Sequence, residues 1–193
     1  MLNRNDIFQT LDMINKRHLD IRTITMGISL MDCADRDIQV CCQKIYDKIT
    51  RCAKDLVRVG EDIEKEFGIP IVNKRISITP IAIAASSCVK TKEDYLKIGK
   101  TLDKAAKKTG VNFIGGFSAI VCKGMTPADT LLMDAIPEVL ANTEHICASI
   151  VVGSTKAGMN MTAIKKCGEM IKEAAYYTKD NDSLQTVYIF EQV

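Results

Sequence analysis

Apolar residues recur with two different periods along this chain, and the regular switch between them constrains the fold more than any other feature. In residues 20–30, isoleucine, methionine and leucine alternate with threonine, glycine and serine, which is typical of a strand. Four later segments have comparable strand patterns: 69–79, 111–114, 145–153 and 186–190. Helix-length segments separate them, and this order favours parallel pairing through right-handed crossovers. We therefore predict a single α/β domain, residues 1–193, with five parallel strands that alternate with helices.

The longest helical pattern places an apolar residue at every third or fourth position from Ile38 to Phe67. Such a stripe predicts one amphipathic helix. Asp35 is expected to cap its start, and Gly68 and Pro70 are expected to end it.

Other helices are marked by their boundary residues. Residues 91–94, Thr-Lys-Glu-Asp, have a capping-box pattern, and Gly110 ends the segment that follows. Residues 126–127, Thr-Pro, mark the start of another helix, which Pro137 is expected to kink or split. Apolar spacing also predicts a short first helix at about 5–17.

The composition is that of an ordinary globular protein, with 47% apolar residues, 26% charged residues and a net charge of +2. Basic residues alternate with acidic ones and form no concentrated stripe, so we expect no nucleic-acid partner. No apolar run approaches the ~20 residues that span a bilayer, and the first residues lack the apolar core of a secretory signal. We therefore expect no membrane association.

Eight cysteines in a chain without a secretory signal indicate reduced thiols and a cytoplasmic location. No C-x-x-C pair occurs, and only two histidines, His18 and His145, are present. We therefore predict no metal site and no redox framework, and the cofactor stays unknown. Most of the cysteines, including the adjacent Cys41 and Cys42 in the long helix, are expected to pack as small core residues.

Four segments carry a resemblance to a known family: IRTITMGISLMDC, GIPIVNKRISITPI, VNFIGGFSAIVCKGMT and VGSTKAGMN. The chain resembles an uncharacterised prokaryotic family of unknown function that is related in fold to pyruvate formate-lyase, a glycyl radical enzyme. The resemblance implies a ten-stranded α/β barrel made of two five-stranded parallel halves, of which this chain would be the first half-barrel. It brings no catalytic residues, because the reaction of the family is unknown. The radical glycine and the loop cysteine that glycyl radical enzymes need would lie beyond Val193.

The last predicted strand, at 186–190, has no helix after it to cover its face. An open parallel sheet needs cover on both faces. We therefore expect either a homo-oligomer or a C-terminal half that is missing from this chain.

In parallel α/β folds, ligands bind at the carboxyl ends of the strands, where loops lead into helix N-termini. The first such loop, residues 29–35, contains Asp32 and Cys33. A thiol ahead of a helix N-terminus would have a lowered pKa, which makes Cys33 the candidate catalytic nucleophile. The competing interpretation, which free cysteines more often fit, is a partly buried thiol beside a capping aspartate.

Gly115, Gly116 and Ser118 follow the third predicted strand and form the second candidate loop. Paired glycines would allow a ligand to approach the backbone closely, or they serve as simple turn residues. Both interpretations stay open on the sequence.

The segment from Gly153 offers Ser154, Thr155 and Lys156 ahead of a helix. Backbone N–H groups, hydroxyls and an ammonium together suit a phosphate or a carboxylate. The segment lacks the spacing of a P-loop, and an ordinary strand–helix connection is the alternative.

Arg75 is the last candidate, because it shares a strand face with Ser77 and Thr79 while the opposite face is isoleucine. If the small polar faces of the first two strands line one cavity, Arg75 can hold an acidic ligand bidentately. Otherwise the arginine is solvated. Lys74 points the other way and is expected to reach water.

Together these patterns predict an enzyme-like barrel half that binds a small anionic metabolite at the carboxyl ends of its strands. The alternatives are a non-catalytic regulatory or assembly module, or a fragment without activity of its own. The sequence predicts neither a reaction nor a substrate.

Overall fold

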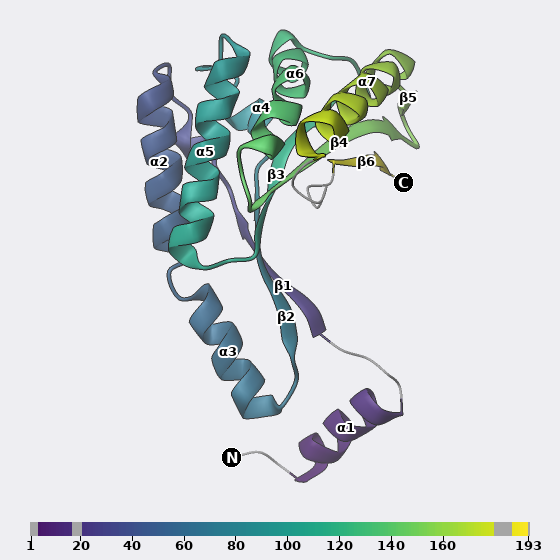
Figure 1. Ribbon diagram of the computed structural model, residues 1–193. Helices are drawn as coiled ribbons and strands as arrows, with labels where there is room; N and C mark the ends of the chain where they lie inside the picture. The colour runs from purple at the N-terminus through teal and green to yellow at the C-terminus, as the bar shows by residue number, and fades with distance from the viewer. Residues whose placement is uncertain (1–3, 17–20, 180–186, 193) are drawn as a thin grey trace.

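The computed structural model describes residues 4–16, 21–179 and 187–192, and its centre is a parallel sheet. The sheet has the strand order β1-β2-β3-β4-β6, every neighbouring pair being parallel, and a two-residue strand, β5, pairs antiparallel with β4. The strand bounds are β1 Ile21–Ile28, β2 Ile71–Ile78, β3 Phe113–Ile120, β4 Ile146–Ser154, β5 Gly158–Met159 and β6 Val187–Gln192. The predicted α/β fold, with mostly parallel strands that alternate with helices, is confirmed (Figure 1). Closure into a barrel stays a prediction.

Helices connect consecutive strands, and the larger ones form a single layer. Their bounds are α1 Arg4–Asn15, α2 Ile38–Cys52, α3 Leu56–Phe67, α4 Ile81–Ala84, α5 Lys92–Thr109, α6 Pro127–Ala141 and α7 Met161–Thr178, with a 3-10 turn, η1, at Met31–Cys33. Figure 1 shows α2, α5, α6 and α7 as neighbours, in the order of the strands that they connect. Among the described residues, no helix combines the length and apolar content needed to cross a membrane.

The prediction of one long helix from Ile38 to Phe67 is wrong, because the structure has two helices there, α2 and α3. The N–H of Ala53 makes the last bond of α2, to the carbonyl of Ile49, and the chain then turns before Leu56. The apolar period continues across this turn, so the sequence pattern hides the break. One consequence is that Val59, Ile63 and Phe67 of α3 remain 37–44% exposed.

Helix caps follow the predicted chemistry with one exception. Thr91 and Thr126 both begin helices with a capping box, and Gly110 ends α5 in the left-handed conformation. The exception is α2, whose cap is Asp37: its carboxylate accepts the N–H groups of Gln39 and Val40, while Asp35 binds the turn before it. Pro137 does not split α6, which is one continuous helix.

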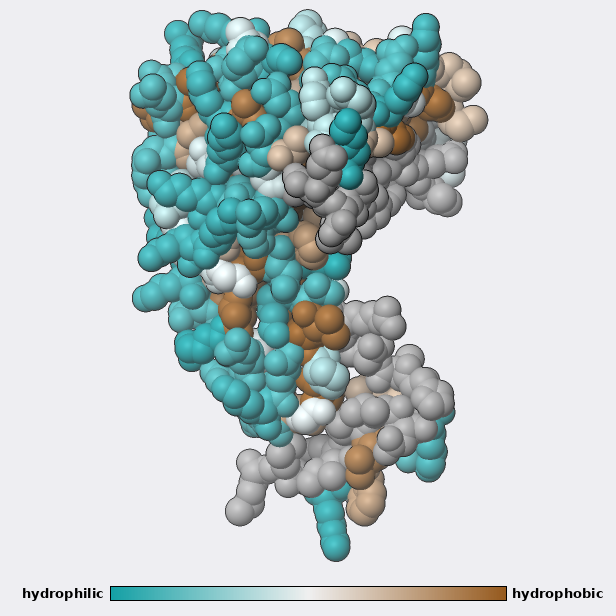
Figure 2. All heavy atoms as spheres, viewed as in Figure 1, coloured by the Kyte–Doolittle hydropathy of each residue, from teal (hydrophilic) through white to brown (hydrophobic). Residues whose placement is uncertain are grey.

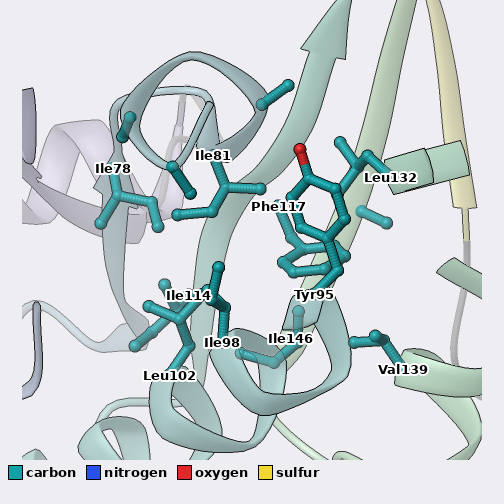
Figure 3. Packing of buried hydrophobic residues seen from close by; sticks show 14 of the residues in the cluster. Ile78, Ile81, Tyr95, Ile98, Leu102, Ile114, Phe117, Leu132, Val139 and Ile146 are labelled. Carbon is teal, nitrogen blue, oxygen red and sulfur yellow. The ribbon is translucent and has the colours of Figure 1, made fainter. Parts of the chain in front are cut away.

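The hydrophobic core lies between the helix layer and one face of the sheet. Along β2, the side chains of Ile76 and Ile78 are buried against the helices, whereas Arg75 and Ser77 between them are exposed. Figure 3 shows Phe117 of β3 at the centre of this core, where it meets the ring of Tyr95 edge to face at 6.2 Å. Because the strands follow one another in sequence order, right-handed crossovers place their helices on the same side. The opposite face of the sheet carries no helix in the described part of the chain; we call it the open face.

Candidate functional site

On the open face, one row of small residues runs across four strands. Gly27 of β1 neighbours Ser77 of β2, which neighbours Gly115 of β3, which neighbours Cys147 of β4. A row of two glycines, a serine and a cysteine leaves room above the sheet that larger side chains would fill. Ser118 and Ser149 are neighbours in a second row nearer the carboxyl ends of the strands.

Arg75 lies one row nearer the amino ends, between Thr25 and Phe113. Its guanidinium lies 5.5 Å from the centre of the Phe113 ring, a cation–π contact that holds the side chain along the open face. Within the described residues, Arg75 forms no ion pair, although arginine can bind a carboxylate with two parallel hydrogen bonds. The guanidinium is therefore available to an anion from outside the described chain.

Cys147 lies close enough to Arg75 for the guanidinium charge to affect the pKa of its thiol. Burial raises the pKa of the Cys147 thiol, and the nearby positive charge of Arg75 opposes this change. The thiol is thus protonated at neutral pH and belongs to the same small region as the arginine.

The glycine pair does not form the predicted loop, and this prediction is wrong. Gly115 and Gly116 lie inside β3, where the pairing with β4 shifts register between Gly115 and Phe117. Gly116 has a φ of 114°, and a Cβ at this position would lie 2.5 Å from the carbonyl oxygen of Ile78. A bulge packed against β2 therefore requires glycine at 116. The hydroxyl of Ser118 donates to the carbonyl of Gly116.

Cys33 does not have the lowered pKa that its position suggested. The side chain is buried, with 3% of its surface exposed, and both this burial and the neighbouring Asp32 raise the pKa of the thiol. Asp32 itself forms an ion pair with Lys48 of α2. Cys33 also lies in the covered core and not on the open face. A buried thiol agrees with the competing interpretation of a packed cysteine.

The segment after β4 does not lead directly into a helix. Ser154 closes a tight turn by accepting the N–H of Ala157, and β5 follows before Asn160 caps α7. Thr155 and Lys156 are exposed on this turn. These residues therefore do not lie at a helix N-terminus, because the N-cap of α7 is Asn160. Anion binding by Ser154, Thr155 and Lys156 stays a prediction.

Two other candidates are engaged in structural contacts. Lys74 points away from Arg75 as predicted, but its ammonium binds Glu64 of α3 at 3.0 Å and the carbonyl of Ile71 instead of reaching water. His145 lies at the start of β4 with its Nδ1 3.3 Å from Asp103, a carboxylate that also accepts the N–H groups of residues 144 and 145. No cluster suited to a metal ion occurs in the described ranges.

The structure thus brings Arg75 and Ser77 of β2 together with Gly115, Gly116 and Ser118 of β3. The remaining predicted residues lie elsewhere: Cys33 in the covered core, and residues 153–156 at the end of β4 and in the turn after it. Sequence reasoning missed Cys147 as part of this region. The period-two pattern of the fourth strand carried the signal, because it places Cys147 on the face opposite the apolar residues.

Comparisons with known proteins identify the family of this chain. A family model described as Uncharacterised ACR (DUF711) matches residues 12–190. A UPF0210 protein of Lachnospira eligens is 60% identical over 184 residues, which cover 95% of this chain and 40% of the relative. UPF0210 proteins of Clostridium perfringens and Pelotomaculum thermopropionicum are 54% and 55% identical over 98% and 95% of this chain.

This chain spans about 40% of the length of the curated relatives that it matches. The predicted resemblance to a family without a known function is confirmed. The chain belongs to the family described as Uncharacterised ACR (DUF711).

Proposed function

We propose that this chain forms half of a closed α/β barrel whose interior is the open face, and that this face binds a small anionic metabolite through Arg75. The observation that carries the proposal is an arginine without an ion-pair partner in the described chain, held over a row of glycine and serine on a sheet face that no described helix covers.

The chemistry of the open face favours an anion. Arg75 supplies a fixed positive charge, and its planar donors match a carboxylate or phosphate. The hydroxyls of Ser77 on β2 and Ser149 on β4, the two strands that flank β3, supply further hydrogen bonds. The small residues between them leave space for a metabolite above the backbone.

The topology favours a barrel. An all-parallel sheet normally has both faces covered, either by two helix layers or by closure on itself. Sequential strand order with helices on one side is the arrangement that closes into a barrel, because each crossover curls the sheet in the same direction. The relatives have more than twice the matched length, which is enough chain to supply the remaining strands. This half-barrel agrees with the resemblance in fold to pyruvate formate-lyase.

A nuclear magnetic resonance titration of this chain with inorganic phosphate and with succinate tests the binding site, since both probes can pair with an arginine. We expect the largest shifts at the backbone amides of Gly27, Ser77, Gly115 and Cys147. The substitution Arg75→Met should weaken binding by about tenfold or more, because it removes a charge-assisted hydrogen bond.

Arg58→Met is the matched control, because Arg58 is an exposed arginine on α3 that pairs with Asp55 and Asp62. This variant should bind both probes as the wild type does. Shifts confined to other regions, or equal binding by Arg75→Met and wild type, would disprove the site.

A further inference from the structure

A hollow lies in the groove between α2 and α5, on the helix side of the sheet and away from Arg75. It has a volume of about 410 Å³, and its lining comes from these two helices alone. The polar residues that line it are Gln39, Gln43, Tyr46, Lys97, Thr101 and Lys104. Figure 2 shows a mostly hydrophilic surface over this part of the helix layer.

Ion pairs join the other neighbouring helices of the layer, but none joins α2 and α5 among the described residues. Lys92 of α5 binds Glu138 of α6 at 3.3 Å, and Lys166 of α7 binds Asp134 of α6 at 2.6 Å. Between α2 and α5, by contrast, no ion pair occurs in the described part of the chain. Across the groove from its lysines, α2 presents amide groups and a tyrosine in place of a carboxylate.

Both lysines of the groove are positioned by contacts that leave donors free. Lys97 binds Asp94 on its own helix at 3.1 Å, and this uses one of the three donors of its ammonium. The Lys104 ammonium lies 5.2 Å from the centre of the Tyr46 ring, so the tyrosine fixes it at the other end of the groove. No carboxylate within the described residues binds Lys104.

The floor between the two lysines is neutral. Thr101 lies between Lys97 and Lys104 on the same face of α5, and Cys42 of α2 lies opposite it. Burial raises the pKa of the Cys42 thiol, while a hydrogen bond with Thr101 and the charge of Lys97 oppose this change. The two lysines are seven residues apart, or about 10 Å along the helix axis.

We propose that this groove is a binding site for a small elongated dianion, with one phosphate or carboxylate group at Lys97 and another at Lys104. The ligand would supply the negative charge that Glu138 and Asp134 supply to the other helix pairs. Thr101 lies between the lysines and would hydrogen-bond the middle of the ligand, while Gln39 and Gln43 line the groove on the α2 side. This site is separate from the open face and does not depend on the function proposed there.

Isothermal titration calorimetry of this chain with inorganic pyrophosphate and with glutarate tests the proposal and separates a phosphate from a carboxylate ligand. We expect one bound probe per chain, and about tenfold or more weaker binding in each of Lys97→Met and Lys104→Met. Lys104→Arg should retain most of the affinity because it keeps the charge. Circular dichroism should show unchanged folding of all variants, since the exchanged side chains lie on the surface.

Lys100→Met is the matched control: this lysine is exposed on the same helix but does not line the groove. It should change the affinity less than twofold, and Arg75→Met should leave this binding unchanged even if the open face binds nothing. The proposal is overturned if neither probe binds, or if Lys100→Met weakens binding as much as Lys104→Met. Binding of a polyglutamate peptide without either small anion would also overturn it.

Discussion

The two faces of one sheet differ in almost every respect. On the covered face, Ile76 is 1% exposed and Phe117 is not exposed at all, and both pack under the helix layer. On the other face, the same strands present Arg75 and Ser77, which are exposed. Because successive side chains of a strand point to opposite faces, each strand contributes to both. The covered face therefore holds the packing that stabilises the fold, and the open face is the one that we propose binds a ligand. Substitutions on one side should barely affect the other.

The strongest test of this separation is Phe117→Ala at the centre of the covered face. Removing a buried phenylalanine leaves a cavity and should lower the free energy of unfolding by about 3–5 kcal/mol. Ser77→Ala on the open face of β2 should change it by less than about 0.5 kcal/mol. Urea unfolding followed by circular dichroism measures both changes. Similar losses of unfolding free energy in the two variants would contradict the separation of the two faces.

The glycines of the two regions give a second test, with a smaller expected effect. Gly116→Ala should destabilise the protein by at least about 2 kcal/mol, because a side chain at a φ of 114° is strained and meets Ile78. A Cβ at Gly27 would meet nothing within 4 Å. Gly27→Ala should therefore leave the midpoint of urea unfolding almost unchanged, and a loss equal to that of Gly116→Ala would show that the open face is packed.

The next prediction concerns Asp103 of α5, whose carboxylate accepts hydrogen bonds from the backbone just before β4. Asp103→Ala leaves two backbone N–H groups without their acceptor and should cost about 1–3 kcal/mol at pH 7. Burial alone would raise the pKa of Asp103, but the hydrogen bonds from residues 144 and 145 and from Lys107 hold it below its usual value. The carboxylate therefore stabilises the fold above about pH 4, and this contribution is lost as the pH falls through the lowered pKa.

Urea unfolding of the wild type and of Asp103→Ala between pH 3 and pH 7 measures this effect. The difference in stability should be constant above about pH 4 and shrink below it. Asp62→Ala is the control, because Asp62 forms an exposed ion pair with Arg58 that should contribute little. A difference that grows as the pH falls would contradict the assigned role of Asp103.

Much of the fold could be predicted because local chemistry determines it. The alternation in β1 and β2 gave the strands and their two faces, and the threonine caps of α5 and α6 gave the helix starts. The break between α2 and α3 could not be predicted, because the apolar period passes through the turn at Ala53 without interruption. Such a break depends on packing and not on a breaking residue.

The candidate site was only partly predictable for a similar reason. Arg75 and Ser77 were found because they share a strand face, and this face depends on the sequence alone. Gly116 was misplaced because a bulge and a turn both need glycine, and only the approach of Ile78 distinguishes them. Cys147 joins the region through the register of β3 with β4, which depends on long-range pairing.

Determining a crystal structure of the full-length relative from Lachnospira eligens would test most directly whether the open face is an enclosed interior. This chain covers 40% of that relative. We expect strands from the rest of that protein to extend the sheet beyond the counterparts of β1 and β6, and the face that corresponds to Arg75 to remain free of helices. A second helix layer packed against that face would contradict the barrel and the binding site together.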